Sequence, residues 1–143
     1  LRIGTMLVSD AVTRALGELP PDAPFRDRLG AAVAAHLDHL LSLTDYTSAN
    51  IRIIGHVPAE VRERVWPQRE AYGEVWADLL RQGRASGAVR ADADLGLLRV
   101  LILGTLNYAS EWYKPDLKPV SAIATEATAM ILDGVLSVHR QPA

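Results

Sequence analysis

The alternation of apolar and polar residues is most informative between residues 87 and 116, where a short loop leads into a very apolar segment. Residues 94–113 fit a helix of roughly 30 Å at 1.5 Å per residue, with apolar side chains around almost its whole circumference. A helix that is apolar on every side must be buried on every side. Because one domain of this size rarely surrounds a helix completely, the pattern predicts that this helix contacts a second subunit and also lines an internal cavity.

Apolar residues at helical spacing predict further helices along the rest of the chain. Residues 46–54 are rich in β-branched side chains, but a lone strand would have no partner in this chain, so a short helix is predicted there. The expected fold is all-α, an orthogonal bundle of about six helices that forms a single domain over residues 1–143. A first helix is predicted to end near Gly17. Three more are predicted at residues 24–43, 58–83 and 120–139.

A few residues are expected to set the boundaries of these helices. Gly87 suits a left-handed cap after the long helix, because glycine adopts positive φ without strain. Asp92 or Asp94 is expected to cap the start of the apolar helix, and Pro115 to end it.

Composition narrows the range of functions. The chain has 49% hydrophobic and 22% charged residues, a formal net charge of -2 and no cysteine. It therefore lacks disulfides, thiol catalysis and thiolate metal sites, and it has no basic face of the kind that binds nucleic acid directly. No apolar run reaches the length of a membrane span, and we expect a cytoplasmic protein without membrane contact.

Catalytic or metal chemistry finds little support in the sequence. His36 and His39 are three residues apart, but no further histidine or cysteine completes a set of metal ligands, so one inward and one solvent-facing histidine are expected. The alternating carboxylates and arginines of residues 60–81 are typical of a solvated helix face. No nucleophile, phosphate-binding or dinucleotide motif occurs, so neither an enzyme nor a cofactor is expected.

Aromatic side chains are the main candidates for a ligand pocket, although such residues more often belong to a core. Asn107 adds a polar group to an otherwise apolar face, where a buried amide needs a partner or costs about 1–3 kcal/mol. That partner is either a neighbouring helix backbone or a ligand. The aromatic residues are Trp66, Tyr72, Trp76, Tyr108 and Trp112.

Several stretches are typical of one known family. They are residues 87–92 (GAVRAD), 97–99 (LLR), 104–107 (GTLN) and 111–116 (EWYKPD), together with the run from Arg69 through Trp76 to Gly83. On these residues the chain resembles the C-terminal regulatory domain of TetR-family transcriptional regulators, from Leu1 to about residue 139.

The resemblance implies a function. In such proteins the last two helices pair with those of a second subunit in a four-helix interface, and the upstream helices enclose an effector pocket. Effector binding then controls DNA binding by an N-terminal domain through allosteric coupling. That domain is missing here, and Leu1 would fall within the helix that links the two domains, so we expect a fragment of a longer homodimeric protein that reaches operator DNA only through the missing part.

The resemblance also implies the location of the pocket. In the branch of the family that the chain resembles, positions matching Leu103 and Asn107 face the cavity. Some relatives that bind acyl-CoA have a charged group near these positions. Leu103 therefore favours a neutral, largely apolar effector that is lipid-like, steroid-like or aromatic, although Arg69 or Arg99 can still supply charge. The expected ligand-binding residues are Leu37, Trp66, Arg69, Tyr72, Trp76, Val100, Leu103 and Asn107.

Two other functions stay open from the sequence. One is a helical dimerisation or scaffold module that binds no ligand, and the other is a metal-dependent helical-bundle enzyme with metal at His36 and His39. For the dimer interface we expect Leu101, Gly104, Thr105, Tyr108, Trp112, Ile123, Ala127, Met130 and Gly134.

Overall fold

The computed structural model describes residues 2–42, 59–114 and 116–134, and these contain five helices and no strand. This confirms the all-α prediction, whereas the helix expected at 46–54 lies outside the described residues. The helices are α1 (Arg2–Gly17), α2 (Phe25–Ser42), α4 (Ala59–Ala85), α5 (Leu95–Trp112) and α6 (Val120–Asp133).

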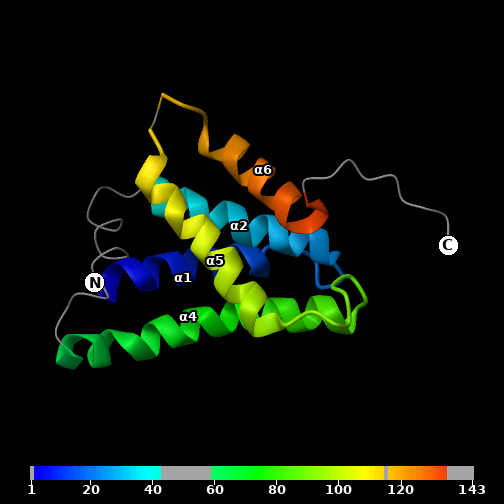
Figure 1. Cartoon of the computed structure of the whole chain (residues 1–143), viewed down its shortest axis with the longest axis horizontal. Coiled ribbons are helices and arrows are strands. Elements are labelled where there is room, and N and C mark those ends of the chain that lie inside the picture. Colours follow the sequence, from blue (N-terminus) through cyan, green and yellow to red (C-terminus); the bar gives the residue numbers. More distant parts are fainter. Residues whose placement is uncertain (1, 43–58, 115, 135–143) are drawn as a thin grey trace.

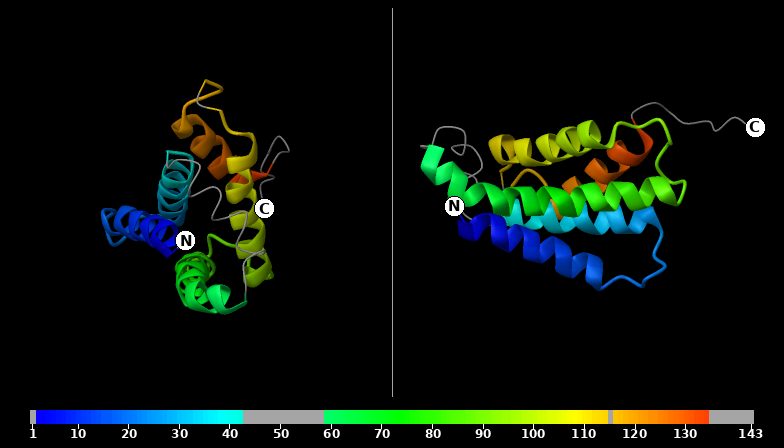
Figure 2. Two further views of the ribbon diagram at one scale, coloured as in Figure 1. Left: turned by 90° about the vertical axis from the view of Figure 1, so that its left-hand side faces the viewer. Right: turned by 90° about the horizontal axis from the view of Figure 1, so that it is seen from below.

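The helices are arranged around α2, which packs against each of the other four (Figure 1). In the right-hand view of Figure 2, α1 lies at the bottom, α2 and α4 lie in the middle, and α5 and α6 lie at the top. α5 crosses the bundle diagonally and contacts both α2 and α4. One side of α5 therefore faces the interior, and its other side faces outward.

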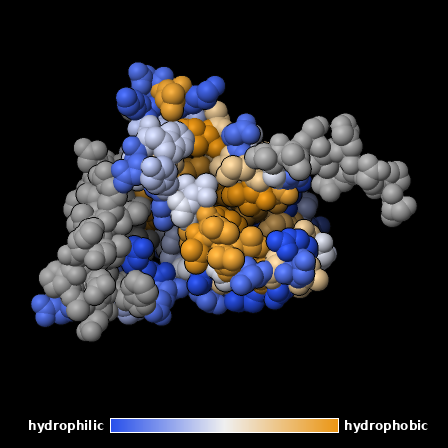
Figure 3. Space-filling model, viewed as in Figure 1, coloured by the Kyte–Doolittle hydropathy of each residue, from blue (hydrophilic) through white to orange (hydrophobic). Residues whose placement is uncertain are grey.

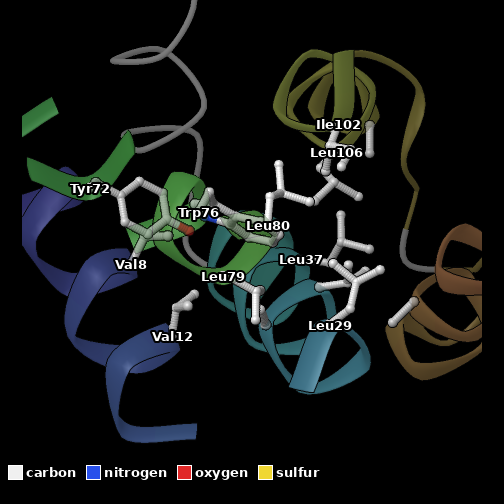
Figure 4. Packing of buried hydrophobic residues seen from close by; sticks show 14 residues of the cluster. Val8, Val12, Leu29, Leu37, Tyr72, Trp76, Leu79, Leu80, Ile102 and Leu106 are labelled. Atoms are coloured by element: carbon white, nitrogen blue, oxygen red, sulfur yellow. The ribbon is translucent and has the colours of Figure 1, made fainter. Parts of the chain in front are cut away.

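A single core connects all five helices (Figure 4). Trp76 is 1% exposed, and Leu37 of α2 and Leu106 of α5 are equally buried. Burying one such leucine side chain stabilises the fold by about 1.5–3 kcal/mol. The same core residues fix the positions of α2, α4 and α5 relative to one another, and so position the polar groups that these helices carry.

The connection from α4 to α5 follows the sequence signals closely. Gly87 has a φ of 86°, and the amides of Ala88 and Val89 both donate to the carbonyl of Gly83, which confirms the predicted glycine cap. A Cβ on Gly83 would lie 2.7 Å from the ring of Phe25, so only glycine allows this close approach of α4 to the start of α2. Asp94 is the N-cap of α5, and its carboxylate accepts a hydrogen bond from the amide of Leu97 at 3.1 Å.

The last helix differs from its prediction. It was expected to run to residue 139, but it ends at Asp133, and Gly134 follows with a φ of 75° and a cap hydrogen bond to the carbonyl of Met130. Gly134 was predicted as a small residue inside the helix, whereas its positive φ ends the helix there. Within the described part of the chain, none of the helices has the length and apolarity needed to cross a lipid bilayer.

Candidate functional site

A chain of hydrogen bonds crosses the apolar interior and joins three helices. His36 of α2 is 3% exposed, and its Nδ1 lies 2.6 Å from the hydroxyl of Tyr72 on α4. Its Nε2 lies 2.7 Å from Oδ1 of Asn107 on α5. One buried imidazole therefore holds α2, α4 and α5 together through two short polar contacts.

The partners of His36 determine its protonation state. Oδ1 of Asn107 is an acceptor, so Nε2 of His36 carries the hydrogen and donates it. Nδ1 is then the unprotonated nitrogen, and it accepts the hydroxyl hydrogen of Tyr72. Burial lowers the pKa of His36 to about 4, against the smaller opposing effect of the Asn107 hydrogen bond. The imidazole is therefore neutral at pH 7, and the whole hydrogen-bonded chain is uncharged.

Two aromatic rings surround this imidazole. The ring of Tyr72 is parallel to it within 3° at a centroid distance of 5.8 Å, and the ring of Trp76 meets it edge-on at 6.0 Å. Burial raises the pKa of the Tyr72 hydroxyl well above its usual range, although the nearby Trp76 acts in the opposite direction. The hydroxyl of Tyr72 points toward Trp76 in Figure 4, but the buried indole Nε1 has no hydrogen bond of acceptable geometry. The indole N–H of Trp76 thus lies near the Tyr72 hydroxyl without forming a well-aligned hydrogen bond.

A second unused polar atom lies two turns away on the same helix. Oε1 of Gln68 is fully buried and accepts no hydrogen bond. Gln68, Tyr72 and Trp76 follow one another at intervals of four residues, which places them on one face of α4. This face therefore carries an unpaired acceptor, Oε1 of Gln68, and a poorly aligned donor, Nε1 of Trp76, on either side of the Tyr72–His36 contact. An unsatisfied buried polar group costs about 1–3 kcal/mol, so both atoms would gain from a polar partner.

The structure brings together several of the residues expected to bind a ligand. Tyr72 and Asn107 are the two partners of His36, and Leu37 and Trp76 belong to the same core. Leu103 packs against that core and is partly buried. One of the two predicted partners of Asn107 was a neighbouring helix backbone. The structure instead shows a contact with the His36 side chain.

Val100 is the remaining expected ligand residue that the structure places away from the core. Val100 is 60% exposed, on the outward side of α5, because the crossing of α5 over α2 and α4 turns that side away from the core. Arg69 is partly buried on α4. The side chain of Trp66 lies outside the described residues.

His36 is the residue whose role the sequence analysis missed. One inward and one solvent-facing histidine were expected, and whereas His39 is partly exposed, His36 is the buried one. Its position in the apolar stripe of α2 was a signal that it needs polar partners in the core. Both of its ring nitrogens are occupied, so neither has a lone pair left for a metal ion, and the described residues contain no group of three or more potential metal ligands. The geometry thus speaks against the metal-dependent alternative.

The outward side of α5 carries a row of exposed apolar side chains. Figure 3 shows hydrophobic surface over α5 and toward α6 on the face presented in Figure 1. Tyr108 is 65% exposed and Leu101 is 56% exposed, whereas Ile123 and Ala127 of α6 pack partly against the core. The other expected interface residues with an exposed position are Gly104, Thr105, Trp112, Met130 and Gly134.

A groove of about 640 Å³ lies elsewhere, where the ends of α4 and α6 meet the starts of α2 and α5. Leu29, Leu80, Ile102 and Ile131 give it apolar walls. Of the expected ligand-binding residues whose side chains the structure describes, none lines this groove, although Leu101 and Thr105 of the expected interface do.

Comparison with known proteins identifies the family to which this fold belongs. A family model described as the tetracyclin repressor-like C-terminal domain matches residues 22–135. The HTH-type transcriptional repressor KstR2 of Mycolicibacterium smegmatis is 34% identical over 64 residues, which cover 43% of this chain and 31% of that repressor. The matched stretch is thus less than a third of the length of that relative.

Two solved structures show the same fold. The TetR-family regulator PfmR of Thermus thermophilus has a TM-score of 0.78 and 22% identity, over 94% of this chain and 72% of that chain. The transcriptional regulator FadR of Bacillus subtilis, crystallised in complex with stearoyl-CoA, has a TM-score of 0.74 and 17% identity, over 94% of this chain and 73% of that chain. Since the family model covers well over half of the sequence, the chain belongs to the tetracyclin repressor-like C-terminal domains of TetR-family transcriptional regulators.

Proposed function

We propose that this chain is the effector-sensing and dimerisation domain of a TetR-type repressor, and that a small, largely apolar ligand binds in its interior. One observation carries the proposal, namely the uncharged chain Tyr72–His36–Asn107 that joins three helices inside an apolar core. Ligand pockets typically combine apolar walls with a few polar groups that orient the ligand.

The groups around this chain define the ligand that would fit. Leu37, Trp76 and Leu103 offer apolar surface, and the Trp76 indole N–H offers a hydrogen-bond donor. A lipid-like, steroid-like or aromatic molecule with a polar group matches both features. The complex of FadR with stearoyl-CoA supports the lipid-like class by analogy.

The same geometry supplies a route to allosteric control. Asn107 ties α5 to His36 of α2, while the opposite side of α5 carries the exposed apolar row that is expected to meet a second subunit. A ligand that replaces His36 as the partner of Asn107 would favour a different position of α5. Because a ligand shifts an equilibrium only through its unequal affinity for two states, this exchange of partners is the proposed source of that difference. An N-terminal DNA-binding domain attached to such a dimer would follow the shift.

Native mass spectrometry of the purified chain tests this proposal. A dimer with an excess mass of a small molecule is the expected result, and the excess would begin to identify the ligand. The variant Asn107→Leu should retain the dimer but lose the bound mass, and Asn107→Asp should change the ligand preference. A bare chain that no long-chain alcohol, steroid or aromatic acid stabilises in a thermal-shift screen would contradict the ligand-sensing role.

A helical dimerisation module without a ligand is the second candidate. The observation in its favour is that Leu37 and Trp76 are each only 1% exposed, so the chain's own side chains fill much of this region. Such a module would give a dimer of bare mass, unaffected by substitution of Asn107.

A further inference from the structure

The groove between the ends of α4 and α6 and the starts of α2 and α5 has the size of a small-molecule pocket. Its volume of about 640 Å³ lies within the range of roughly 300–1,000 Å³ that is typical of such pockets. Core residues Leu29, Leu80 and Ile102 line it, and Figure 4 shows them between α2, α4 and α5. His36 and its two hydrogen-bond partners, which all belong to the described part of the chain, do not line it. The groove is therefore separate from the polar chain around His36.

The charged side chains that line the groove are paired within the chain. The guanidinium of Arg26 meets the carboxylate of Asp133 in two hydrogen bonds, at 3.0 and 3.3 Å, and this pair links the start of α2 to the end of α6. Arg90 donates to the carboxylate of Asp92 at 2.8 Å. No other charged residue of the described ranges lines the groove. A ligand with a net charge would have to compete with one of these ion pairs, whereas a neutral ligand leaves both pairs intact.

Thr105 of α5 adds a hydroxyl without a partner to this groove. The two threonines of α6, Thr125 and Thr128, donate to the carbonyls four residues earlier, at 2.9 and 2.8 Å. Thr105 forms neither this bond nor any other hydrogen bond to the residues that the structure describes. A hydroxyl both donates and accepts hydrogen bonds. The groove thus combines apolar walls with one neutral group that is able to orient a ligand.

We propose that the groove binds a neutral, largely apolar small molecule with one hydroxyl or carbonyl group, which forms a hydrogen bond with Thr105. The apolar part of the molecule lies against Leu29, Ile102 and Ile131, which come from three different helices. This site is additional to the proposed ligand site around His36 and does not depend on it. Thr105 is also expected at the subunit interface, so the groove adjoins that interface, and its ligand contacts α5 and α6 together.

Three pentylbenzene compounds that differ only in the para substituent test the chemistry of the site. The phenol carries a hydroxyl, pentylbenzene itself carries no polar group, and the benzoate carries a negative charge. Isothermal titration calorimetry on the full chain should show that para-pentylphenol binds about three- to tenfold more tightly than pentylbenzene, which is the usual contribution of one neutral hydrogen bond. The benzoate should bind at least about tenfold more weakly than the phenol, because it brings an unpaired charge against apolar walls.

Variants at the rim locate the binding site. Ala88 is an exposed residue that lines the groove, and the nearby Ala85 is an exposed residue that does not. Ala88→Phe places a ring in the groove and should weaken binding of para-pentylphenol at least about tenfold, whereas Ala85→Phe should leave it unchanged. Thr105→Val keeps the shape of the side chain and should lower the affinity for the phenol to that for pentylbenzene. Thermal unfolding checks that each variant keeps the fold.

The outcomes separate this site from the one around His36. Binding that is lost in Ala88→Phe and retained in Asn107→Leu would support the groove as the site. Binding that is lost in Asn107→Leu and retained in Ala88→Phe would place the probe in the interior, and would overturn the groove site while the proposed function stands. A benzoate that binds as tightly as the phenol, or the absence of binding by all three probes, would also overturn the groove site.

Discussion

α2 and α5 are both 18 residues long, yet the more apolar of the two is the less buried. α2 carries six buried residues although charged and histidine side chains occupy a third of its length, whereas α5 has only three buried residues and two charged ones. Leu97, Val100, Leu101 and Tyr108 of α5 are all more than half exposed. A helix of this composition is not explained by the packing of one chain.

The difference indicates which part of each helix is occupied by intramolecular contacts. α2 contacts every other described helix, so its apolar stripe is fully used within the chain. α5 uses one side for the core and for Asn107, and leaves an apolar row outside. Exposed apolar patches of this kind usually mark a protein interface. The comparison therefore supports a second subunit on the outer side of α5, in line with the proposed homodimer.

The largest expected effect comes from the same substitution made in both helices. Leu37→Ala on α2 removes a side chain that is 1% exposed and should lower the free energy of unfolding by about 2–5 kcal/mol. Leu101→Ala on α5, at 56% exposure, should change it by less than about 0.5 kcal/mol at concentrations where the chain is monomeric. Urea unfolding followed by circular dichroism measures both. Equal losses would mean that the burial contrast between the two helices is wrong.

The next effect tests the polar link between α2 and α5 through pH. The pKa of His36 is about 4 in the folded chain, below the ordinary value of about 6.5 expected after unfolding. Between these pH values the unfolded chain binds a proton that the folded chain does not. The contribution of His36 to the free energy of unfolding is therefore fully present above pH 6.5 and is lost as the pH drops toward 4. The loss attributable to His36 is about 3 kcal/mol.

Urea unfolding at a series of pH values isolates this contribution. His36→Gln should be less stable at pH 7 but should lose less stability on acidification than the wild type. His39→Gln, at the partly exposed neighbour, is the matched control and should follow the wild-type profile. Parallel profiles for wild type and His36→Gln would show that the imidazole does not lie in the buried state described.

Much of the fold could be predicted because its signals are local. The ends of α2, α4 and α5 fell within about two residues of their predictions, since spacing of apolar residues, Gly87 and Asp94 all act within a few turns. Gly134 shows the limit, because a glycine near a helix end is either an interior small residue or a cap, and spacing alone does not decide between them.

The site was harder to predict because its contacts are distant in sequence. Tyr72 and Asn107 are 36 and 71 residues from His36, and only the crossing of three helices brings them together. Val100 was misplaced for the same reason, since an all-round apolar helix gives no periodic signal for which side faces inward. The need of Asn107 for a buried partner was predicted because a lone amide on an apolar face is a signal in itself, but His36 was not predicted as that partner.

A smaller effect tests the outer side of α5 directly. A Cβ on Gly104 meets no atom within 4 Å, so Gly104→Leu should leave the stability of the single chain unchanged or slightly higher. In a dimer packed against this glycine the added side chain should cost about 1–3 kcal/mol, and so weaken the dimer about tenfold or more. Sedimentation velocity across a concentration series measures the dissociation constant. Gly96→Leu, at another exposed glycine of α5, is the control, and an unchanged dimer in Gly104→Leu would place the interface elsewhere.

The smallest effect concerns how α5 begins. Because α5 has half as many buried residues as α2, a larger share of its stability must come from local signals, of which the Asp94 cap is the clearest. Asp94→Ala should lower the free energy of unfolding by about 1 kcal/mol in urea titrations. Asp92→Ala removes a carboxylate that pairs with the exposed Arg90 two residues away, and should cost clearly less than Asp94→Ala. The loss in Asp94→Ala should be the same at every protein concentration, unlike that in Gly104→Leu, because a cap stabilises the helix whether or not its outer side is covered. Equal losses in the two aspartate variants would instead assign the stabilisation to the negative charge of the loop. They would contradict the expectation that α5 depends on its N-cap more than α2 does.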